Sequence, residues 1–329
     1  MARSEQGEGV RVLITGIGGF VGGHLARHLQ ATSPDVTIHG TVLFRGQAAL
    51  DNAIVCHALN LNDAQALSEL VAAIRPDHVY HLAAQASPRR SFAEPWETLE
   101  NNIHAQLNLI LACLTLNPPP RLLIVSSAEI YGPVQADQLP VTETAPFCPT
   151  SPYGVSKVAQ DMLGLQYFLS HRLPVIRARP FNHFGPGQSE GFVAPDFAMQ
   201  IARIEAGLQE PVIRVGNLSA RRDFTDVRDV VRAYRLLMER GTPGEAYNIA
   251  SGQARSIQTL LDGLLRHSTA AIEVKTDPER LLPIDAPVIQ GDASRLRQAT
   301  GWEPAIPFED TLLDILNDCR ARVRQKTTQ

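Results

Sequence analysis

Residues 10–22 have the sequence VRVLITGIGGFVG, and this stretch decides the class of fold. Residues 10–15 are mostly apolar, which is typical of a strand buried on both faces. Glycines follow at positions 16, 19 and 22, and a helical pattern starts at Val21. Glycines so placed allow a tight turn, close approach of a phosphate to the backbone, and close packing of helix on strand. The stretch predicts a dinucleotide-binding strand–turn–helix unit, with a simple turn as the alternative.

Strand and helix patterns alternate outward from this unit through the first half of the chain. Such alternation requires parallel strands joined by helical crossovers. We therefore expect an α/β fold with a doubly wound parallel sheet of the Rossmann type, together with a smaller, interleaved C-terminal α/β domain. Strands are predicted at residues 36–42, 78–82, 122–126 and 175–179, and helices at 21–30, 64–74, 99–116 and 155–170.

The pattern changes after Pro180. Residues 182–191 are rich in glycine and predict a loop, and shorter elements follow it. We assign residues 10–179 to a nucleotide-binding domain that also takes back about 224–252, and residues 180–223 and 253–325 to a second domain. Helices are predicted there at 197–207, 226–238, 257–267 and 308–323, and strands at 211–215 and 246–249.

The composition excludes several classes of protein. Of the 329 residues, 44% are hydrophobic and 19% are charged, which excludes a disordered chain. The formal charge of −4 gives no electrostatic reason to bind nucleic acid or an anionic membrane. No apolar run approaches the roughly twenty residues of a membrane span. Four widely spaced cysteines predict reduced thiols in the cytoplasm, and ten histidines without ligand spacing predict no metal site.

The type of dinucleotide depends on the end of the second predicted strand. Residues 40–46 read GTVLFRG, with no acidic residue to hold the ribose hydroxyl of NAD. The guanidinium of Arg45 could instead pair with a 2′-phosphate. NADP(H) is therefore favoured, NAD(H) stays open, and a solvated loop arginine is the alternative reading of Arg45.

Tyr153 and Lys157 are four residues apart, on one face of a predicted helix. A free phenol has a pKa of about 10 and is a poor acid–base catalyst at neutral pH. We expect the ammonium group of Lys157, with the positive ring of an oxidised cofactor, to lower the pKa of Tyr153. Residues 126–132, SSAEIYG, follow a predicted strand, and a serine there could hydrogen-bond the reacting oxygen.

These motifs resemble those of the extended short-chain dehydrogenase/reductases that act on nucleotide sugars. The resemblance includes HLAA at residues 81–84 and runs from about Val10 to Val323. The segments RPFNHFGPGQ (179–188), VGNL (215–218) and RDFTDVRD (222–229) are most similar to members that reduce or dehydrate GDP-linked sugars. The resemblance implies NAD(P)H-dependent reduction of GDP-4-keto-6-deoxy-D-mannose to GDP-D-rhamnose. The alternative is a GDP-mannose 4,6-dehydratase or another nucleotide-sugar 4-epimerase or dehydratase.

The resemblance also implies a role for each matching residue. Tyr153 would protonate the sugar C4 oxygen, Lys157 would hold the nicotinamide ribose, and Ser127 would hydrogen-bond the C4 carbonyl. Cofactor contacts would come from Gly16, Gly19, Phe20, Val21 and Gly22 at the pyrophosphate, Leu61 at the adenine, and Leu82, Ala83 and Ala84 at the ribose. Substrate contacts would come from Ser127, Glu129, Asn182, Val193, Asn217, Arg222 and Arg280.

Three positions depart from the family's pattern or keep an alternative open. Asn60 stands where an aspartate is usual, and Leu282 stands where an arginine binds the diphosphate. Either Arg280 reaches the phosphates from a shifted loop or one contact is missing. Glu129 stands where dehydratases carry the carboxylate that removes the C5 proton, although it could also be a hydrogen-bonding wall of the sugar pocket. Ser127, where dehydratases generally have threonine, favours reduction.

Two further expectations concern partners and roles. Arg222 either neutralises the substrate phosphates or forms an ion pair with Asp223 or Asp226. Apolar residues at 107–111 and 162–165 predict two helices that, by the resemblance, pair across a two-fold axis in a homodimer. The alternative is that both faces cover the sheet of the monomer. A non-catalytic NADP-binding regulator is a third functional reading, which the intact serine, tyrosine and lysine disfavour.

Overall fold

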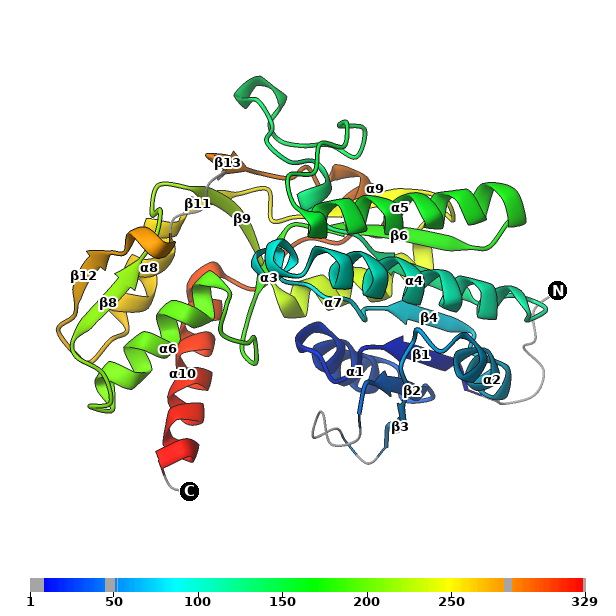
Figure 1. The fold of residues 1–329 in the computed structure, drawn as a ribbon, viewed down its shortest axis with the longest axis horizontal. Coiled ribbons are helices and arrows are strands. Elements are labelled where there is room, and N and C mark those ends of the chain that lie inside the picture. The colour runs from blue at the N-terminus through cyan, green and yellow to red at the C-terminus, as the bar shows by residue number, and fades with distance from the viewer. Residues whose placement is uncertain (1–8, 45–50, 52, 281–285, 328–329) are drawn as a thin grey trace.

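The computed structural model describes residues 9–44, 51, 53–280 and 286–327. Its central sheet contains seven strands, all of whose neighbouring pairs are parallel (Figure 1). From β1 the chain adds β2 and β3 on one side of the sheet and then β4, β5 and β6 on the other. Doubly wound sheets open a crevice for ligands at such a switch point, here between β1 and β4. The predicted Rossmann-type fold is therefore confirmed. In spatial order the strands are β10 (Ala246–Ile249), β6 (Val175–Pro180), β5 (Arg121–Val125), β4 (His78–His81), β1 (Arg11–Thr15), β2 (Thr37–Val42) and β3 (Val55–Ala58).

Helices cover both faces of this sheet, because successive side chains of a strand point to opposite faces. In β1, Val12 and Ile14 belong to the core beneath α1 (Phe20–Thr32) and α7 (Val227–Arg240). Leu13 belongs to the core on the opposite face. That face is covered by α2 (Ala64–Ile74), α4 (Pro95–Leu114) and α5 (Pro152–His171), with the short α3 (Pro88–Ala93) beside them.

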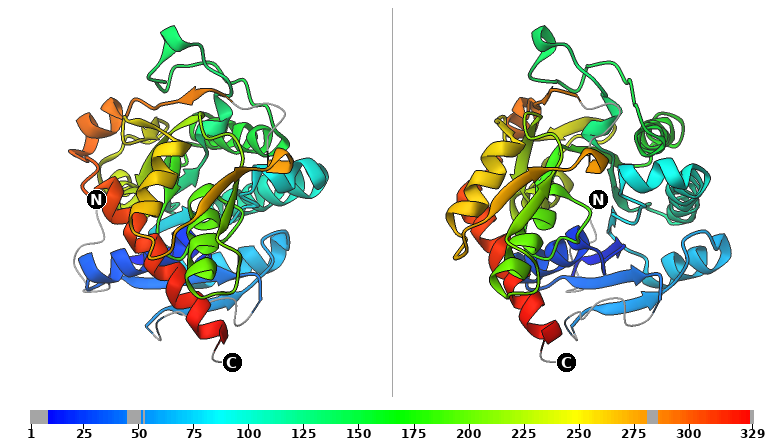
Figure 2. Two further views of the ribbon diagram at one scale, coloured as in Figure 1. Left: turned by 90° about the vertical axis from the view of Figure 1, so that its left-hand side faces the viewer. Right: turned by 60° about the vertical axis from the view of Figure 1, so that its left-hand side comes forward.

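A second group of elements follows β6 and has a core of its own (Figure 2). Its helices are α6 (Val193–Glu205), α8 (Ile257–Arg266) and α10 (Phe308–Thr327), which pack on one another. β9 pairs with three segments that are distant in sequence. The strands are β7 (Asn182–Phe184), β9 (Arg221–Asp226), β11 (Ala254–Ser256) and β13 (Val288–Ile289) in one sheet, and β8 (Val212–Val215) with β12 (Glu273–Thr276) in another.

The chain returns to the central part twice after β6. α7 packs against α1, and β10 adds the last strand to the seven-stranded sheet beside β6. α9 (Ser294–Thr300) packs on α7, and Trp302, which follows it, is fully buried. No helix in the part of the chain that the structure describes is long and apolar enough to cross a membrane.

Candidate active site

The glycine turn after β1 lies against the end of β4. Gly16 has a φ of +70°, and a Cβ there would lie 2.9 Å from backbone atoms of Ala83. The Thr15 hydroxyl accepts hydrogen bonds from the backbone N–H groups of Leu82 (3.2 Å) and Ala83 (3.3 Å). The turn and the segment after β4 therefore form one rigid edge of the crevice, and only glycine fits at position 16.

The N-terminus of α1 faces out of the same turn. Gly19 caps this helix without a side-chain hydrogen bond, and a Cβ at Gly22 would fall within 3 Å of the backbone of Ile17. The first N–H groups of a helix have no partner within the helix and carry a partial positive charge. A cradle without side chains beside such N–H groups fits the pyrophosphate of a dinucleotide. Phe20 and Val21 supply the first two residues of the helix.

Residues expected near the adenine and ribose lie along the neighbouring strand ends. Leu61, which follows β3, is buried, and its carbonyl oxygen accepts a hydrogen bond of 3.0 Å from the Asn108 amide. Leu82, Ala83 and Ala84 are half-buried directly after β4. Asn60 is exposed, and its side chain accepts from the backbone N–H of Asn62. Arg45 and Leu282 lie outside the described residues.

α5 carries the predicted tyrosine and lysine. It begins at Pro152, and the Ser151 hydroxyl caps it by accepting from the backbone N–H of Gly154 at 3.0 Å. Tyr153 and Lys157 are both buried one turn apart, and the Lys157 ammonium nitrogen lies 5.7 Å from the centroid of the Tyr153 ring. The Ser127 hydroxyl makes a hydrogen bond with the Tyr153 phenol. The structure therefore brings the three predicted residues together.

The three residues lie at the carboxyl ends of β4 and β5, beside the crevice. The Lys157 ammonium donates a hydrogen bond of 2.9 Å to the carbonyl oxygen of Val125, the last residue of β5. His81, the last residue of β4, shares a hydrogen bond of 2.8 Å with Thr15. Burial, with a smaller contribution from the charge of Lys157, lowers the pKa of His81 to about 3. His81 is thus a neutral residue that packs at the end of β4.

The electrostatics correct one expectation. Burial raises the pKa of Tyr153, the hydrogen bond from Ser127 opposes this rise, and the charge of Glu129 adds to it. Burial also lowers the pKa of Lys157 to about 7. The expectation that the ammonium group makes the phenol unusually acidic is wrong for the ligand-free protein, because both groups are removed from water and Lys157 is bound to a backbone carbonyl.

The other five predicted substrate residues, apart from Ser127 and Glu129, lie in the second group of elements. Arg280 lies between two carboxylates, with Asp196 of α6 at 3.9 Å and Asp277 at 3.7 Å. Its backbone is so close to Gly216 that a Cβ there would lie 2.6 Å from the Arg280 carbonyl oxygen. These contacts bring Arg280 close to the start of α6 and to the turn at Asn217. Val193, the first residue of α6, is half-buried there.

The other two predicted substrate residues, Asn182 and Arg222, lie on β7 and β9. Asn182 is exposed at the start of β7, where it pairs with Phe224 of β9. Arg222 donates hydrogen bonds to the carbonyl oxygens of Arg221 (2.8 Å) and Ala286 (2.7 Å). The carboxylate of Asp223 accepts backbone N–H groups of the neighbouring segments, and that of Asp226 accepts from Arg228.

One buried residue near the site was not predicted. Asn102 of α4 accepts a hydrogen bond of 2.8 Å from the backbone N–H of Gln85. Its amide donates to the Gln85 carbonyl at 3.1 Å and to the Ser156 hydroxyl at 2.9 Å. It thus ties the segment after β4 to α5 next to Tyr153. A polar residue on the buried face of a predicted helix was the one available signal.

The described ranges contain histidine, cysteine and carboxylate side chains, the groups that hold metal ions in proteins when several lie together. No group of three or more histidine, cysteine, aspartate or glutamate side chains there is placed to hold a metal ion. All four cysteines lie in these ranges as free thiols, two buried and two exposed.

Comparisons with known proteins agree with this geometry. The family model described as GDP-mannose 4,6 dehydratase matches residues 13–315. A GDP-6-deoxy-D-mannose reductase from Pseudomonas aeruginosa is 36% identical over 316 residues, which cover 96% of this chain and 99% of the relative. The structure of RMD from Pseudomonas aeruginosa complexed with NADPH has a TM-score of 0.84 at 34% identity and covers 96% of this chain and 99% of that one. A UDP-glucose 4-epimerase from Thermus thermophilus in complex with NAD also has a TM-score of 0.84, at 27% identity, with 94% and 99% covered.

The match spans most of the chain, and the relatives modify nucleotide sugars with a nicotinamide cofactor. The chain therefore belongs to the GDP-mannose 4,6 dehydratase family of extended short-chain dehydrogenase/reductases, and it is an NAD(P)-dependent nucleotide-sugar oxidoreductase.

Proposed function

We propose that this protein uses NADPH to reduce the C4 ketone of GDP-4-keto-6-deoxy-D-mannose to GDP-D-rhamnose. The observation that carries the proposal is the placement of Tyr153 one helical turn before Lys157 on α5, with the Lys157 ammonium nitrogen 5.7 Å from the centroid of the Tyr153 ring and Ser127 beside the phenol. The reductase from Pseudomonas aeruginosa, at 36% identity over nearly the whole of both chains, supports the choice of reaction.

A ketone reductase needs an acid that keeps its proton until the carbonyl oxygen gains negative charge. Because burial raises the pKa of Tyr153, its phenol stays protonated through neutral pH. Tyr153 would give this proton to the C4 oxygen, and Ser127 would donate a hydrogen bond to the same oxygen. When bound, the nicotinamide supplies the hydride. Lys157 would hold the hydroxyl groups of the nicotinamide ribose.

The glycine cradle and the strand ends beside it supply the cofactor site of this proposal. The solved relative that holds NADPH supports NADP(H), and the relative that holds NAD keeps NAD(H) open. Arg45 remains the proposed partner of a 2′-phosphate. The pyrophosphate would lie on Gly16, Gly19, Phe20, Val21 and Gly22, the adenine against Leu61, and the ribose along Leu82, Ala83 and Ala84.

The second core supplies the proposed sugar-nucleotide site. Asn182, Arg222 and Arg280 would bind the diphosphate, since guanidinium groups donate paired hydrogen bonds to phosphate oxygens. Val193 and Asn217 would line the same side of the pocket. The proposed division keeps residues 10–179 and about 224–252 for the cofactor, and residues 180–223 and 253–325 for the sugar nucleotide. The return of α7 and β10 to the central sheet supports it.

We further propose that two copies pair through α4 and α5, in the cytoplasm. Val155, Met162 and Leu169 are exposed at intervals of seven residues, and so lie on one side of α5. Leu109 and Ile110 are buried in the monomer's own core, but Leu111 is exposed. Trp96, in the first turn of α4, is 76% exposed. Met162→Arg should convert dimers to monomers in analytical ultracentrifugation, and a monomeric wild type would refute the pairing.

One observation favours a second function. Glu129 lies two residues after Ser127 in the turn that follows β5, and its charge adds to the rise in the pKa of Tyr153. A dehydratase uses a carboxylate there to remove the C5 proton and returns its hydride to the sugar. The family model that matches the chain also bears the name of a dehydratase.

Cofactor stoichiometry separates the two functions. The reductase should oxidise one NADPH for each keto-sugar consumed, measured as loss of NADPH absorbance. Glu129→Gln should then lose less than about tenfold in kcat, since Glu129 holds no transferred proton in reduction. Turnover of GDP-mannose without added cofactor and without net oxidation, abolished in Glu129→Gln, would replace the reductase by a dehydratase.

A further inference from the structure

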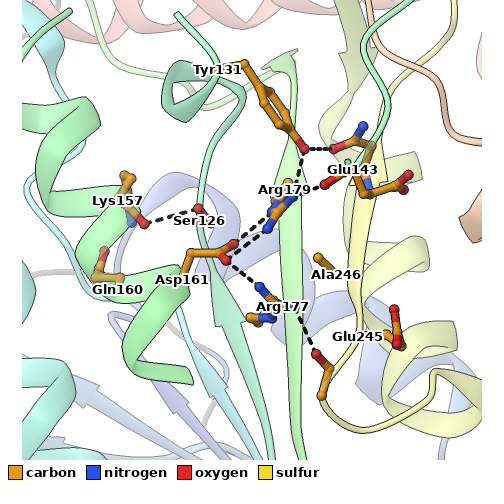
Figure 3. Close-up of polar contacts among 12 residues, drawn as sticks. Ser126, Tyr131, Glu143, Lys157, Gln160, Asp161, Arg177, Arg179, Glu245 and Ala246 are labelled. Carbon is orange, nitrogen blue, oxygen red and sulfur yellow. Dashed lines mark hydrogen bonds and ion pairs between the residues drawn. The ribbon is translucent and has the colours of Figure 1, made fainter. Parts of the chain in front are cut away.

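A network of buried polar groups lies beside Lys157, between α5 and β6 (Figure 3). Its centre is Asp161, which is fully buried one turn beyond Lys157 on α5. Arg177 donates to one oxygen of Asp161 at 2.6 Å. Arg179 donates to both of its oxygens, from Nε at 2.8 Å and from Nη2 at 3.0 Å. The face of α5 that holds Tyr153 and Lys157 is thus fixed on β6 by charged hydrogen bonds.

Arg179 extends the network to the segment that carries Ser127. Its Nη1 donates to the Tyr131 hydroxyl at 3.0 Å and to the Glu143 carbonyl oxygen at 2.9 Å. The Tyr131 hydroxyl in turn donates to Oδ1 of Asn248 in β10 at 2.7 Å. Tyr131 ends the single turn of 3₁₀-helix that starts after Ser127. The same guanidinium therefore touches the carboxylate beneath Lys157 and the segment that carries Ser127.

Arg177 provides the contrast within the same network. It shares the carboxylate of Asp161, but its other hydrogen bond, of 2.9 Å, goes to the carbonyl oxygen of Gly244, away from Ser127. Of the two arginines, Arg179 is the one that also contacts Tyr131. Buried ion pairs often add little stability over well-packed apolar residues of similar volume.

We propose that Arg179 and Tyr131, anchored on Asp161, are positioning residues that hold the segment of Ser127 in place beside Tyr153. The reaction in which they act rests on the proposed function. The placement of Ser127 beside Tyr153 would serve any reaction that uses these two residues. Neither residue touches the reacting atoms, so both act through the placement of the 127–131 segment.

Two matched tyrosine variants test the proposal. Tyr131→Phe removes the hydroxyl between Arg179 and Asn248 and keeps the ring. Tyr247→Phe removes the hydroxyl of another buried tyrosine, which lies in β10. This hydroxyl accepts a hydrogen bond of 2.9 Å from the backbone N–H of Thr242. Each variant loses one buried hydroxyl, and only the first lies in the network.

The measurements are kcat and KM with NADPH and keto-sugar, and amide hydrogen exchange of the folded proteins. Tyr131→Phe should lower kcat by about tenfold or more, because small misplacements of a catalytic group have large effects on rate. Its KM for NADPH should stay within about twofold, since the glycine cradle is untouched. Exchange should quicken at the amides of Ile130, Tyr131 and Cys148, and Tyr247→Phe should change neither kcat nor these amides.

Equal kcat in wild type and Tyr131→Phe, or an equal fall in both variants, would overturn the proposal. A second pair tests the same link if Tyr131→Phe does not fold. Arg179→Lys should lower kcat more than Arg177→Lys at equal loss of stability, since lysine lacks the fork that spans two partners. If the wild type reduces no keto-sugar, the proposed function fails by itself. Faster exchange confined to Tyr131→Phe would then still support the positioning role, and unchanged exchange would refute it.

Discussion

Two adjacent glycines of α1 make a sharp test of the cofactor cradle. An alanine Cβ at position 22 would meet the Gly16 carbonyl oxygen, and would lie 2.7 Å from Cα and 2.8 Å from the carbonyl oxygen of Ile17. These are backbone atoms of the turn, so no flexible side chain can move aside. At position 23 the nearest atoms are the guanidinium nitrogens of Arg27, at 3.8 and 3.9 Å.

The magnitudes follow from these contacts. Overpacking costs about 1–3 kcal/mol, and alanine in a helix regains about 1 kcal/mol over glycine. Gly22→Ala should therefore lower the free energy of unfolding by up to about 2 kcal/mol, whereas Gly23→Ala should raise it by up to about 1 kcal/mol. Because the displaced atoms belong to the phosphate turn, Gly22→Ala should also weaken NADPH binding by about threefold to tenfold.

Urea denaturation gives the stabilities, and the fluorescence of bound NADPH gives the dissociation constants. Gly23→Ala is the control, because it makes the same chemical change one residue along the same helix. If Gly22→Ala unfolds at the same urea concentration as Gly23→Ala, or binds NADPH as tightly as the wild type, our description of the cradle is wrong.

Two further predictions concern buried charged groups. Burial lowers the pKa of Lys157 from its ordinary value of 10.5 to about 7, so between these pH values the unfolded chain binds more protons than the folded one. The stability of the ligand-free wild type should therefore rise from pH 7 to pH 10 relative to Lys157→Met in thermal unfolding, and parallel pH profiles would contradict this. Asp223 accepts from the N–H groups of Ser251, Gly252 and Gly291 and from the Ser251 hydroxyl. Asp223→Asn turns an amide towards some of these donors and should cost about 2–4 kcal/mol in urea denaturation, and a loss below about 0.5 kcal/mol would count against this anchoring role.

Local patterns in the sequence predict the elements of the central sheet well. The helix predicted at residues 64–74 and the strand predicted at 246–249 coincide with α2 and β10. Periodic apolar residues carry this information, because each element buries a face against a large core. β7, β11 and β13 were not predicted, since they have two or three residues each and exist through pairing with β9.

The candidate site divides in the same way. Helical spacing places Tyr153 and Lys157 on one face of α5, and this is what the structure shows. The hydrogen bond from Ser127 joins segments 26 residues apart and rested on the resemblance. The direction of the pKa shift of Tyr153 was predicted wrongly, because burial outweighs a neighbouring charge and a linear sequence does not display burial. Asp161 and Arg179 were not singled out, since their pairing depends on the packing of α5 on β6.

The most direct test follows a deuterium atom. NADPH that carries deuterium at the transferred position of its nicotinamide is mixed with GDP-4-keto-6-deoxy-D-mannose, and the product sugar is examined by NMR. We predict one deuterium at C4 for each NADPH oxidised, and a rate lower by about 10²–10⁴-fold in Tyr153→Phe at equal cofactor occupancy. Deuterium that never reaches C4, or a Tyr153→Phe variant as fast as the wild type, would contradict proton transfer from Tyr153 to a reduced ketone.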